Sequence, residues 1–297
     1  MNQLLSIVVP CHNRFFDLVK LVESIPARDD IEVILVDDHS TEDLTRIELS
    51  YFSQHKFIRN DSCLRYAGAA RNLGIEHSSG EYLFFADSDD LIVADGFLKC
   101  LKRLTEEKPD ILFSKTTSFV DKDGSLGTRH IRSNWLVDCV LAGQDTAILA
   151  RFGGPCAKFV RREFVSRHKI RFETQRVSND IVFAAQLMVN QPKVLVNNEI
   201  VYSVRQGNPS LTTDFTIEST EERLAALLRY NQVLKANRLG YLMAPALLLL
   251  IRLFKKSPLR VAYWSVKFLL SGQPVVLTHW TLKNVWLRYR SHKRGIV

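Results

Sequence analysis

The stretch Gly80–Asp90, GEYLFFADSDD, places an apolar run directly before three carboxylates. The run Tyr82–Ala86 predicts a buried strand, and the polar turn after it predicts a strand end that meets a ligand. Carboxylates this close repel one another and raise each other's pKa unless a cation offsets them. Mg²⁺ and Mn²⁺ prefer oxygen ligands and commonly join protein carboxylates to substrate phosphates. The stretch therefore predicts a strand that ends in a divalent-metal site, with a solvated, helix-capping acidic turn as the alternative.

Two further polar clusters follow apolar runs on the N-terminal side of this stretch. Ser6–Val9 leads into Pro10–Arg14, and Glu32–Val36 leads into Asp37–Ser40. Helical patterns alternate with these runs, at 18–25, 67–77 and 95–107, and another strand is expected at 111–114. Such alternation predicts an α/β fold with a mostly parallel sheet covered on both faces. Because the carboxyl ends of adjacent parallel strands share one edge, we expect the three clusters to meet in one crevice.

Composition excludes several classes of protein. The chain has 297 residues, of which 46% are hydrophobic and 24% charged, so it can bury a sizeable core. Its five cysteines include no CxxC pair, which argues against a disulfide framework or a zinc site and favours a reducing compartment.

No signal peptide is expected, and no apolar run reaches the roughly 18 residues of a membrane span. The longest run, Leu239–Ile251, is broken by Pro245 and predicts a buried core helix or an interfacial one. We therefore expect a cytoplasmic protein.

The C-terminal region is strongly basic. The net charge of the chain is +8, and Arg252–Arg294 contains many cations but no carboxylate. Such a segment favours an anionic partner, either a membrane surface or nucleic acid. Because no nucleic-acid-binding motif accompanies the charge, we expect no nucleic-acid partner. Trp264, Trp280 and Trp286 among the cations favour peripheral contact with the inner face of the cell membrane, with a helical subdomain packed on the core as the alternative.

Four motifs occur in a characteristic order along the first part of the chain. They are SIVVPCHNR at 6–14, VILVDDHSTED at 33–43, AGAARNLGI at 67–75 and GEYLFFADSDD at 80–90. Together they resemble the successive motifs of the family 2 glycosyltransferases, which have the GT-A fold, and the resemblance covers about residues 4–210. It implies a Rossmann-like, mostly parallel mixed sheet flanked by helices.

The resemblance also implies an activity. It is an inverting, metal-dependent transfer of a hexose or N-acetylhexosamine from a nucleotide-diphosphate sugar, expected to be a UDP-sugar, with Mn²⁺ or Mg²⁺ as cofactor. The acceptor is implied to be a hydroxyl of a glycan or lipid-linked molecule in the synthesis of bacterial lipopolysaccharide, capsule or exopolysaccharide.

The matching motif positions imply roles for individual residues on the donor side. Pro10 and His12 would line the nucleobase pocket, and Asp38 would accept a hydrogen bond from a uracil-type N–H. Asp89 of the DxD motif would bind the metal directly, with Asp87 toward the ribose or the sugar. The full set implied to bind the donor is Pro10, His12, Asn13, Arg14, Asp38, Arg71, Asn72, Asp87, Ser88 and Arg205, the last through the diphosphate.

A second constellation concerns the acceptor. The segment Gly154–Phe164 resembles the part of the family that precedes the acceptor site, and Asp180 matches the position of the catalytic base. Four departures from the family pattern affect substrate identity more than reaction class. They are His12 for tyrosine, His39 for glycine, Cys156-Ala157 for Trp-Asn, and Asn179 for glutamate.

The domain organisation follows from these motifs and from the basic tail. We expect a catalytic domain over 1–215, with the nucleotide-sugar part at 1–120 and the acceptor part at 121–215, and a helical region over 216–297. A helix at Ile181–Val189 is expected to be capped by Asn179 or Ser178, with a strand following at 193–202. Ser219 and Glu222 have the spacing of a capping box that would open a helix ending near residue 234.

A receiver-like phosphoacceptor module is the rival interpretation from another functional class. Asp37-Asp38, Asp87 and Lys115 imitate the paired aspartates, second aspartate and lysine of such modules. However, a strand at Ser6–Pro10 precedes the acidic pair, where a receiver has its first strand. Residues 120–297 would also have no role.

Overall fold

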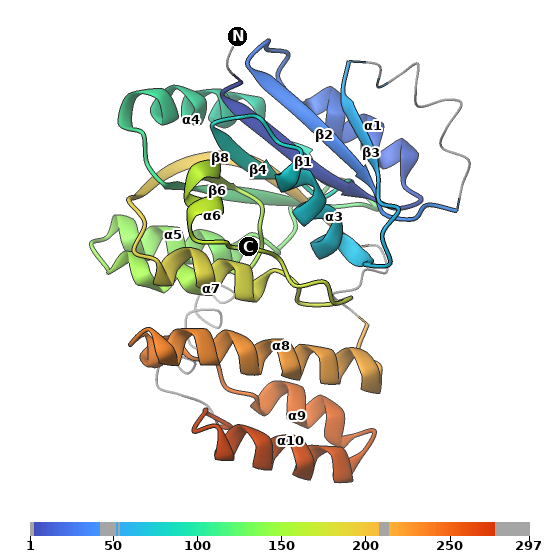
Figure 1. Cartoon of the computed structure of the whole chain (residues 1–297), viewed down its shortest axis with the longest axis vertical. Helices are drawn as coiled ribbons and strands as arrows, with labels where there is room; N and C mark the ends of the chain where they lie inside the picture. Colours follow the sequence, from blue (N-terminus) through green and yellow to red (C-terminus); the bar gives the residue numbers. More distant parts are fainter. Residues whose placement is uncertain (1–2, 42–51, 53, 208–213, 277–297) are drawn as a thin grey trace.

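The computed structural model describes residues 3–41, 52, 54–207 and 214–276 (Figure 1). A single eight-stranded sheet runs through this part of the chain in the order β3-β2-β1-β4-β7-β6-β8-β5. The strands are β1 Leu5–Cys11, β2 Ile31–Asp37, β3 Lys56–Arg59, β4 Tyr82–Phe85, β5 Leu91–Ile92, β6 Ile111–Val120, β7 Lys158–Arg161 and β8 Val194–Gln206.

The N-terminal half of the sheet is parallel, as the alternation of apolar runs predicts. Strand β1 pairs in parallel with β2 on one side and with β4 on the other, and β2 pairs with β3. Cys11 lies opposite Asp37 at the carboxyl ends of β1 and β2, and Val8 lies opposite Phe85 at the end of β4. The three polar clusters therefore leave the sheet at one edge.

The other half of the sheet makes it mixed. Strand β7 is antiparallel to both β4 and β6, whereas β6 and β8 run parallel to each other. The strand pattern at 158–161 did not stand out in the sequence, because the run is short and begins with the buried Lys158. Strand β6 also continues well beyond 114, because Thr116 and Ser118 alternate into the interior as buried polar residues.

Helices cover both faces of the sheet, as Figure 1 shows for α4 and α5 on opposite sides of β6 and β8. The helices and 3₁₀ turns are α1 Phe15–Ser24, α3 Tyr66–Glu76, α4 Ala94–Glu107, α5 Ile131–Leu141, η1 Thr146–Arg151, α6 Arg162–Arg167, α7 Ile181–Val189, α8 Ile217–Ala236, η2 Gly240–Leu242, α9 Leu247–Phe254 and α10 Pro258–Leu270. Helices α3 and α4 match the expected 67–77 and 95–107 to within one residue.

Two glycines explain why α3 lies so close to its neighbours. A β-carbon on Gly74 would collide with the Val8 side chain of β1, and one on Gly68 would collide with the carbonyl oxygen of Glu173. Glycine at these two positions lets α3 pack directly on the sheet and on the 170–180 segment. Residues of α3 are thereby brought beside residues about a hundred positions later in the chain.

Helices α8, α9 and α10 form a separate layer below the sheet (Figure 1). Helix α8 packs against α7, which lies between it and the sheet. The capping-box expectation for α8 was wrong, because the helix begins at Ile217 and Thr216 is its N-cap. The Thr216 hydroxyl accepts a hydrogen bond from the Ser219 amide at 3.1 Å, and the Ser219 hydroxyl turns instead to the carbonyl oxygen of Asp214 at 3.0 Å. The earlier hydroxyl thus takes the capping position.

The long apolar run near the C-terminus is divided at Pro245, as expected, into η2 and α9. Leu250 and Leu253 of α9 and Trp264 and Phe268 of α10 are buried among the three helices. No helix in the described part of the chain is both long and apolar enough to cross a bilayer. The basic tail beyond residue 276, including Trp280 and Trp286, lies outside the described residues.

Candidate active site

The loops that follow β1 and β2 are joined by a dense set of hydrogen bonds. The Asn13 amide donates to the Ser40 hydroxyl at 3.0 Å, and the Asn13 side chain both donates to the Thr41 hydroxyl at 3.0 Å and accepts from the Thr41 amide at 2.8 Å. Asn13 and His39 have positive φ angles of 50° and 61°. His39 thus adopts a glycine-like backbone, and its ring contacts the Asp38 carboxylate and the Ser62 carbonyl oxygen.

His12 and Asp38, expected at the nucleobase, lie together at this edge. Nδ1 of His12 is 2.8 Å from the carbonyl oxygen of Asp38, and the Asp38 carboxylate accepts a hydrogen bond from Asn60 at 3.1 Å. Pro10 lies next to this pair near the end of β1. Arg14, two residues after His12, donates to Asp89 at 3.0 Å, so one short loop contacts both the β2 cluster and the acidic turn.

The acidic turn after β4 is fixed by strand β8. The Asp87 amide donates to the Tyr202 hydroxyl at 2.8 Å, and the Asp90 carboxylate accepts from the Arg205 amide at 2.7 Å. Burial, reinforced by the charge of Asp87, raises the pKa of Asp89 and raises that of Asp90 well above its usual value. These carboxylates are costly to keep ionised without a cation, as the sequence suggested.

A compact group of possible metal ligands is formed by Asp87, Asp90 and Cys156, whose ligand atoms lie within 4.8 Å of one another. Burial raises the pKa of the Cys156 thiol well above its usual value, so the sulfur is a poor ligand for a hard ion. The carboxylates of Asp87, Asp89 and Asp90 therefore fit Mg²⁺ or Mn²⁺ better than the thiol does. Asp90 was not assigned an individual role from the sequence, although it ends the same acidic motif. Ser88 of that motif, which was expected to bind the donor, is buried.

Arg71 joins the acidic turn to the acceptor side of the site. Its side chain is only 5% exposed and donates to Asp87 at 2.5 Å and to Asn179 at 3.1 Å. Its neighbour Asn72 exchanges two hydrogen bonds with the Phe172 backbone, at 2.8 and 2.9 Å. In this arrangement Asn72 holds the 170–180 segment against α3.

Asp180 lies at the start of α7, where the expected capping by Asn179 or Ser178 was wrong. Asp180 itself occupies the N-cap position, and no side chain caps the helix. The Asn179 side chain is instead engaged by Arg71 and by the Gln175 carbonyl oxygen. Burial raises the pKa of Asp180, an effect that Arg71 opposes. A carboxyl group with a raised pKa at the edge of a pocket suits a general base.

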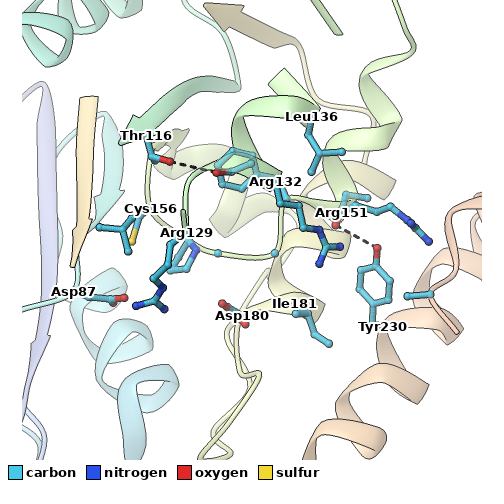
Figure 2. A pocket seen from close by; sticks show the side chains of 18 of the residues that line it. Asp87, Thr116, Arg129, Arg132, Leu136, Arg151, Cys156, Asp180, Ile181 and Tyr230 are labelled. Carbon is cyan, nitrogen blue, oxygen red and sulfur yellow. Dashed lines mark hydrogen bonds between the residues drawn. The ribbon is translucent and has the colours of Figure 1, made fainter. Parts of the chain in front are cut away.

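A pocket of about 480 Å³ connects these elements (Figure 2). Asp87, Asp90 and Cys156 line it on one side, and Asp180 and Ile181 line it at the start of α7. Its remaining wall includes Arg129, Arg132, Arg151 and Tyr230. These arginines were not predicted from sequence patterns, because they follow no strand end and come from the loop before α5, from α5 and from η1.

Lys158 is buried next to the loop at 152–154, which lines the pocket. It is 1% exposed, and its ammonium group donates to the carbonyl oxygens of Phe152, at 2.7 Å, and of Gly154. Burial lowers its pKa to about 7, although nearby Asp180 opposes the change. Lys158 thus fixes the 152–154 loop, which lines the pocket.

Arg205, expected at the diphosphate, lies at the end of β8 between two carboxylates. Its guanidinium pairs with Asp17 at 2.6 Å and with Asp121 at 2.7 Å. Asp17 also lies 3.5 Å from Arg14, which in turn pairs with Asp89. Arg205 is therefore connected to the acidic turn through its own backbone amide and through this chain of ion pairs.

The lysine of the rival receiver-like interpretation does not approach the acidic cluster. Lys115 pairs with Asp138 of α5 at 2.5 Å. The sheet also departs from an all-parallel receiver arrangement, because β7 is inserted antiparallel between β4 and β6. The structure thus does not favour the phosphoacceptor alternative.

The fold places polar loops after parallel strands and an acidic turn beside a pocket. The pattern described as "Glycosyl transferase family 2" matches residues 6–168, so the chain belongs to this family of glycosyltransferases.

Several named glycosyltransferases are similar to this chain, in agreement with this membership. The glycosyltransferase GlyG of Streptococcus pneumoniae is 26% identical over 73% of this chain and 76% of its own length. The poly(ribitol-phosphate) beta-glucosyltransferase of Bacillus spizizenii is 28% identical over 67% of this chain, which spans only 31% of that enzyme. A Campylobacter jejuni relative, GalNAc(5)-diNAcBac-PP-undecaprenol beta-1,3-glucosyltransferase, is 25% identical over 57% of this chain and 55% of its own.

Solved structures show the same fold. The crystal structure of S. aureus TarS 1-349 in complex with UDP-GlcNAc matches with a TM-score of 0.57 at 18% identity, over 86% of this chain and 74% of that one. The expected GT-A architecture, with a mixed sheet and a helical C-terminal region, is thereby confirmed.

Proposed function

We propose that the protein transfers a sugar, with inversion, from a UDP-sugar to a hydroxyl of a glycan or lipid-linked acceptor in bacterial surface-polysaccharide synthesis. The observation that carries the proposal is that Asp180 and the acidic turn of Asp87 and Asp90 line one pocket. An acceptor hydroxyl in that pocket would stand between a base and a phosphate-binding edge. The UDP-sugar is supported by the TarS likeness, and the acceptor class by the names of the Bacillus and Campylobacter relatives.

On the donor side, the proposal gives each polar loop one part of the nucleotide sugar. Pro10, His12 and Asp38 hold the nucleobase at the ends of β1 and β2. Asp87 and Ser88 face the ribose or the sugar, and Arg14 and Arg205 lie on the side of the diphosphate. The ion pairs of the two arginines with Asp17 keep them in place.

A divalent ion, Mn²⁺ or Mg²⁺, would be held by Asp89 with help from Asp87 and Asp90, and when bound it supplies charge stabilisation for the departing diphosphate. Asp180 removes the proton from the acceptor hydroxyl as that oxygen attacks the anomeric carbon. Arg71, buried beneath Asp87 and near Asp180, keeps these two carboxylates in position. No covalent intermediate with the protein is required.

Nucleotide binding tests the donor assignment without knowledge of the acceptor. We expect UDP and a UDP-sugar to raise the melting temperature of the full chain, more strongly with Mn²⁺ than without, because ligands that bind only the folded state stabilise it. At a concentration about 100 times Kd the gain is about 2.7 kcal/mol. Differential scanning fluorimetry with UDP, GDP and CDP measures this. A larger shift with GDP or CDP than with UDP would refute the assignment of a uridine donor.

The C-terminal helices support a further part of the proposal, contact with an anionic membrane surface. The outward side of α10 carries an apolar stripe with helical spacing: Leu259 is 85% exposed, Tyr263 59%, Val266 53% and Leu270 85%. Arg252, Lys255, Lys256, Arg260 and Lys267 lie on or between α9 and α10. Apolar residues that enter a lipid surface beside cations that meet anionic headgroups are typical of peripheral membrane proteins.

Flotation with liposomes tests this contact. We expect the full chain to bind vesicles that contain anionic phospholipid and to bind zwitterionic vesicles weakly. Leu259→Glu combined with Leu270→Glu should reduce vesicle binding about tenfold or more. The double change removes two leucines that would enter the lipid and adds two negative charges that anionic headgroups repel. Leu126→Glu, which changes a leucine that is 62% exposed outside the C-terminal helices, is the matched control. Equal binding by the double variant and the control would show that the stripe does not contact lipid.

A further inference from the structure

Three arginines, Arg129, Arg132 and Arg151, line the candidate active-site pocket and form what we call the arginine wall. Arg129 lies in the loop before α5, Arg132 in the first turn of α5, and Arg151 at the end of η1, and all three line the pocket that also contains Asp180. Figure 2 shows the guanidinium ends of Arg129 and Arg132 directed into this pocket. Neither the nucleobase nor the metal-site assignment uses these residues.

The positive charges of Arg132 and Arg151 lie close enough to affect each other. Arg151 is 6% exposed and donates to the carbonyl oxygens of Leu242 at 2.8 Å and Met243 at 2.7 Å. Burial lowers its pKa to about 10, and the like charge of Arg132 acts in the same direction. Like charges at close range repel one another, and a bound anion relieves that repulsion.

Arg129 is fixed between this wall and the acidic turn. Its guanidinium donates to the Arg205 carbonyl oxygen at 2.9 Å, and the Arg205 amide binds Asp90. The hydrogen bond of Arg129 therefore goes to a neutral group, and its charge is available to a ligand in the pocket. The side chain is exposed, so a ligand can reach it without a rearrangement of the core.

The order of the strands separates Arg132 and Arg151 from the strands of the nucleobase edge and the acidic turn, whereas Arg129 contacts Arg205 at the end of β8. The nucleobase edge lies at β1 and β2 and the acidic turn follows β4, whereas the arginine wall is built on β6, α5 and η1, beyond β7. A nucleotide sugar that runs from β2 to β4 presents its sugar to the pocket, so the arginine wall meets the molecule on the far side of the sugar. That molecule is the acceptor.

We propose that the acceptor carries a phosphate near the hydroxyl that is glycosylated, and that Arg129 and Arg132 bind this phosphate. The proposal rests on the function proposed above and specifies its acceptor. Guanidinium groups match phosphate with paired, charge-assisted hydrogen bonds, and two of them on one wall fix both position and orientation. Arg151 acts as a positioning residue. Its hydrogen bonds to the carbonyl oxygens of Leu242 and Met243 attach η1 to the end of η2, and its charge adds to the positive potential of the pocket.

The test compares a polyol phosphate with its parent alcohol on the full chain. Glycerol 3-phosphate and glycerol are titrated calorimetrically into protein saturated with UDP and Mg²⁺, so that the donor phosphate site is already filled. We expect glycerol 3-phosphate to bind at concentrations where glycerol gives no signal. Arg129→Gln and Arg132→Gln should each weaken the binding of glycerol 3-phosphate at least about tenfold, because each removes a charge-assisted hydrogen bond to the phosphate. Arg167→Gln, which changes an exposed arginine of α6 away from the pocket, should bind it like the wild type.

The affinity for UDP is measured on the same variants and separates the two sources of phosphate. It should stay within about twofold of the wild-type value in both pocket variants. A parallel loss of UDP and glycerol 3-phosphate would assign the arginines to the donor diphosphate and overturn the proposal. Equal binding of glycerol 3-phosphate and glycerol, with UDP bound normally, would overturn it as well. A wild-type protein that binds glycerol 3-phosphate but not UDP would instead refute the donor assignment and leave the phosphate site standing.

Discussion

Asp180→Asn is expected to lower kcat for sugar transfer by about 10²–10⁴-fold, the usual contribution of a positioned general base. Asparagine keeps the size of the side chain at the start of α7 but cannot accept a proton from the acceptor hydroxyl. Donor binding should persist, because Asp180 faces the pocket rather than the nucleobase edge. The initial rate of UDP release, measured with the best acceptor from a panel of glycans and polyol phosphates, checks the expected loss.

The pH profile gives the same assignment a second, independent readout. Burial raises the pKa of Asp180, and the base acts only when it is deprotonated. Transfer should therefore be lost as the pH falls through that raised pKa and be complete above it. The contribution of Asp180 to the acidic limb should vanish from the residual activity of Asp180→Asn, whereas the contribution of Asp89 and Asp90, whose pKa values are also raised, should remain. Asp123→Asn, in the exposed loop after β6, is the control and should keep both rate and profile. Near-normal transfer by Asp180→Asn would remove this residue as the base.

Asp89→Asn is expected to reduce transfer by about 10²-fold or more and to abolish its dependence on Mn²⁺. A metal that stabilises a departing diphosphate contributes several kcal/mol, and each 1.36 kcal/mol corresponds to a factor of ten in rate. The change also leaves Arg14 without one of its carboxylate partners beside the diphosphate site. Rates measured across a Mn²⁺ titration, together with UDP binding at each concentration, separate lost metal binding from lost donor binding.

A neighbouring aspartate provides the matched control for this variant. Asp95 follows the same motif, but its side chain is 94% exposed on α4 and pairs only with Lys99 among the ion pairs described. Asp95→Asn should therefore keep the rate and the Mn²⁺ response of the wild type. Should Asp89→Asn retain a full Mn²⁺ response while Asp90→Asn loses it, the direct ligand would be Asp90, whose carboxylate lies within the compact group with Asp87.

Sequence patterns predicted best where local rules and the fold agree. The run Tyr82–Ala86 gave a buried strand because nearly every residue in it is apolar, and the helices near 67–77 and 95–107 carried clear periodicity. Patterns failed where a hydrogen bond elsewhere in the structure decided the outcome. Asn179 could have capped α7, but its side chain is taken by Arg71, which lies 108 residues earlier.

The pocket itself could not be predicted in the same way. The donor-side clusters follow strands, so their meeting at one edge is a consequence of parallel pairing. Arg129, Arg132 and Arg151 follow no such rule, and nothing in the sequence around Lys158 predicts that this lysine is buried. The packing of η1 against α5 and α7, together with the antiparallel insertion of β7, brings these side chains together.

Family membership, the parallel half of the sheet and the edge at which the polar loops meet could all be predicted from the order of amino acids alone. Those features depend on runs of neighbouring residues, whose hydrophobicity and turn chemistry act locally along the chain. The tertiary structure decided which carboxylates lie together, what engages Asn179 and Arg205, and which cations line the pocket. Each of these depends on distances between residues far apart in the chain, and such distances are set by packing and burial rather than by local pattern.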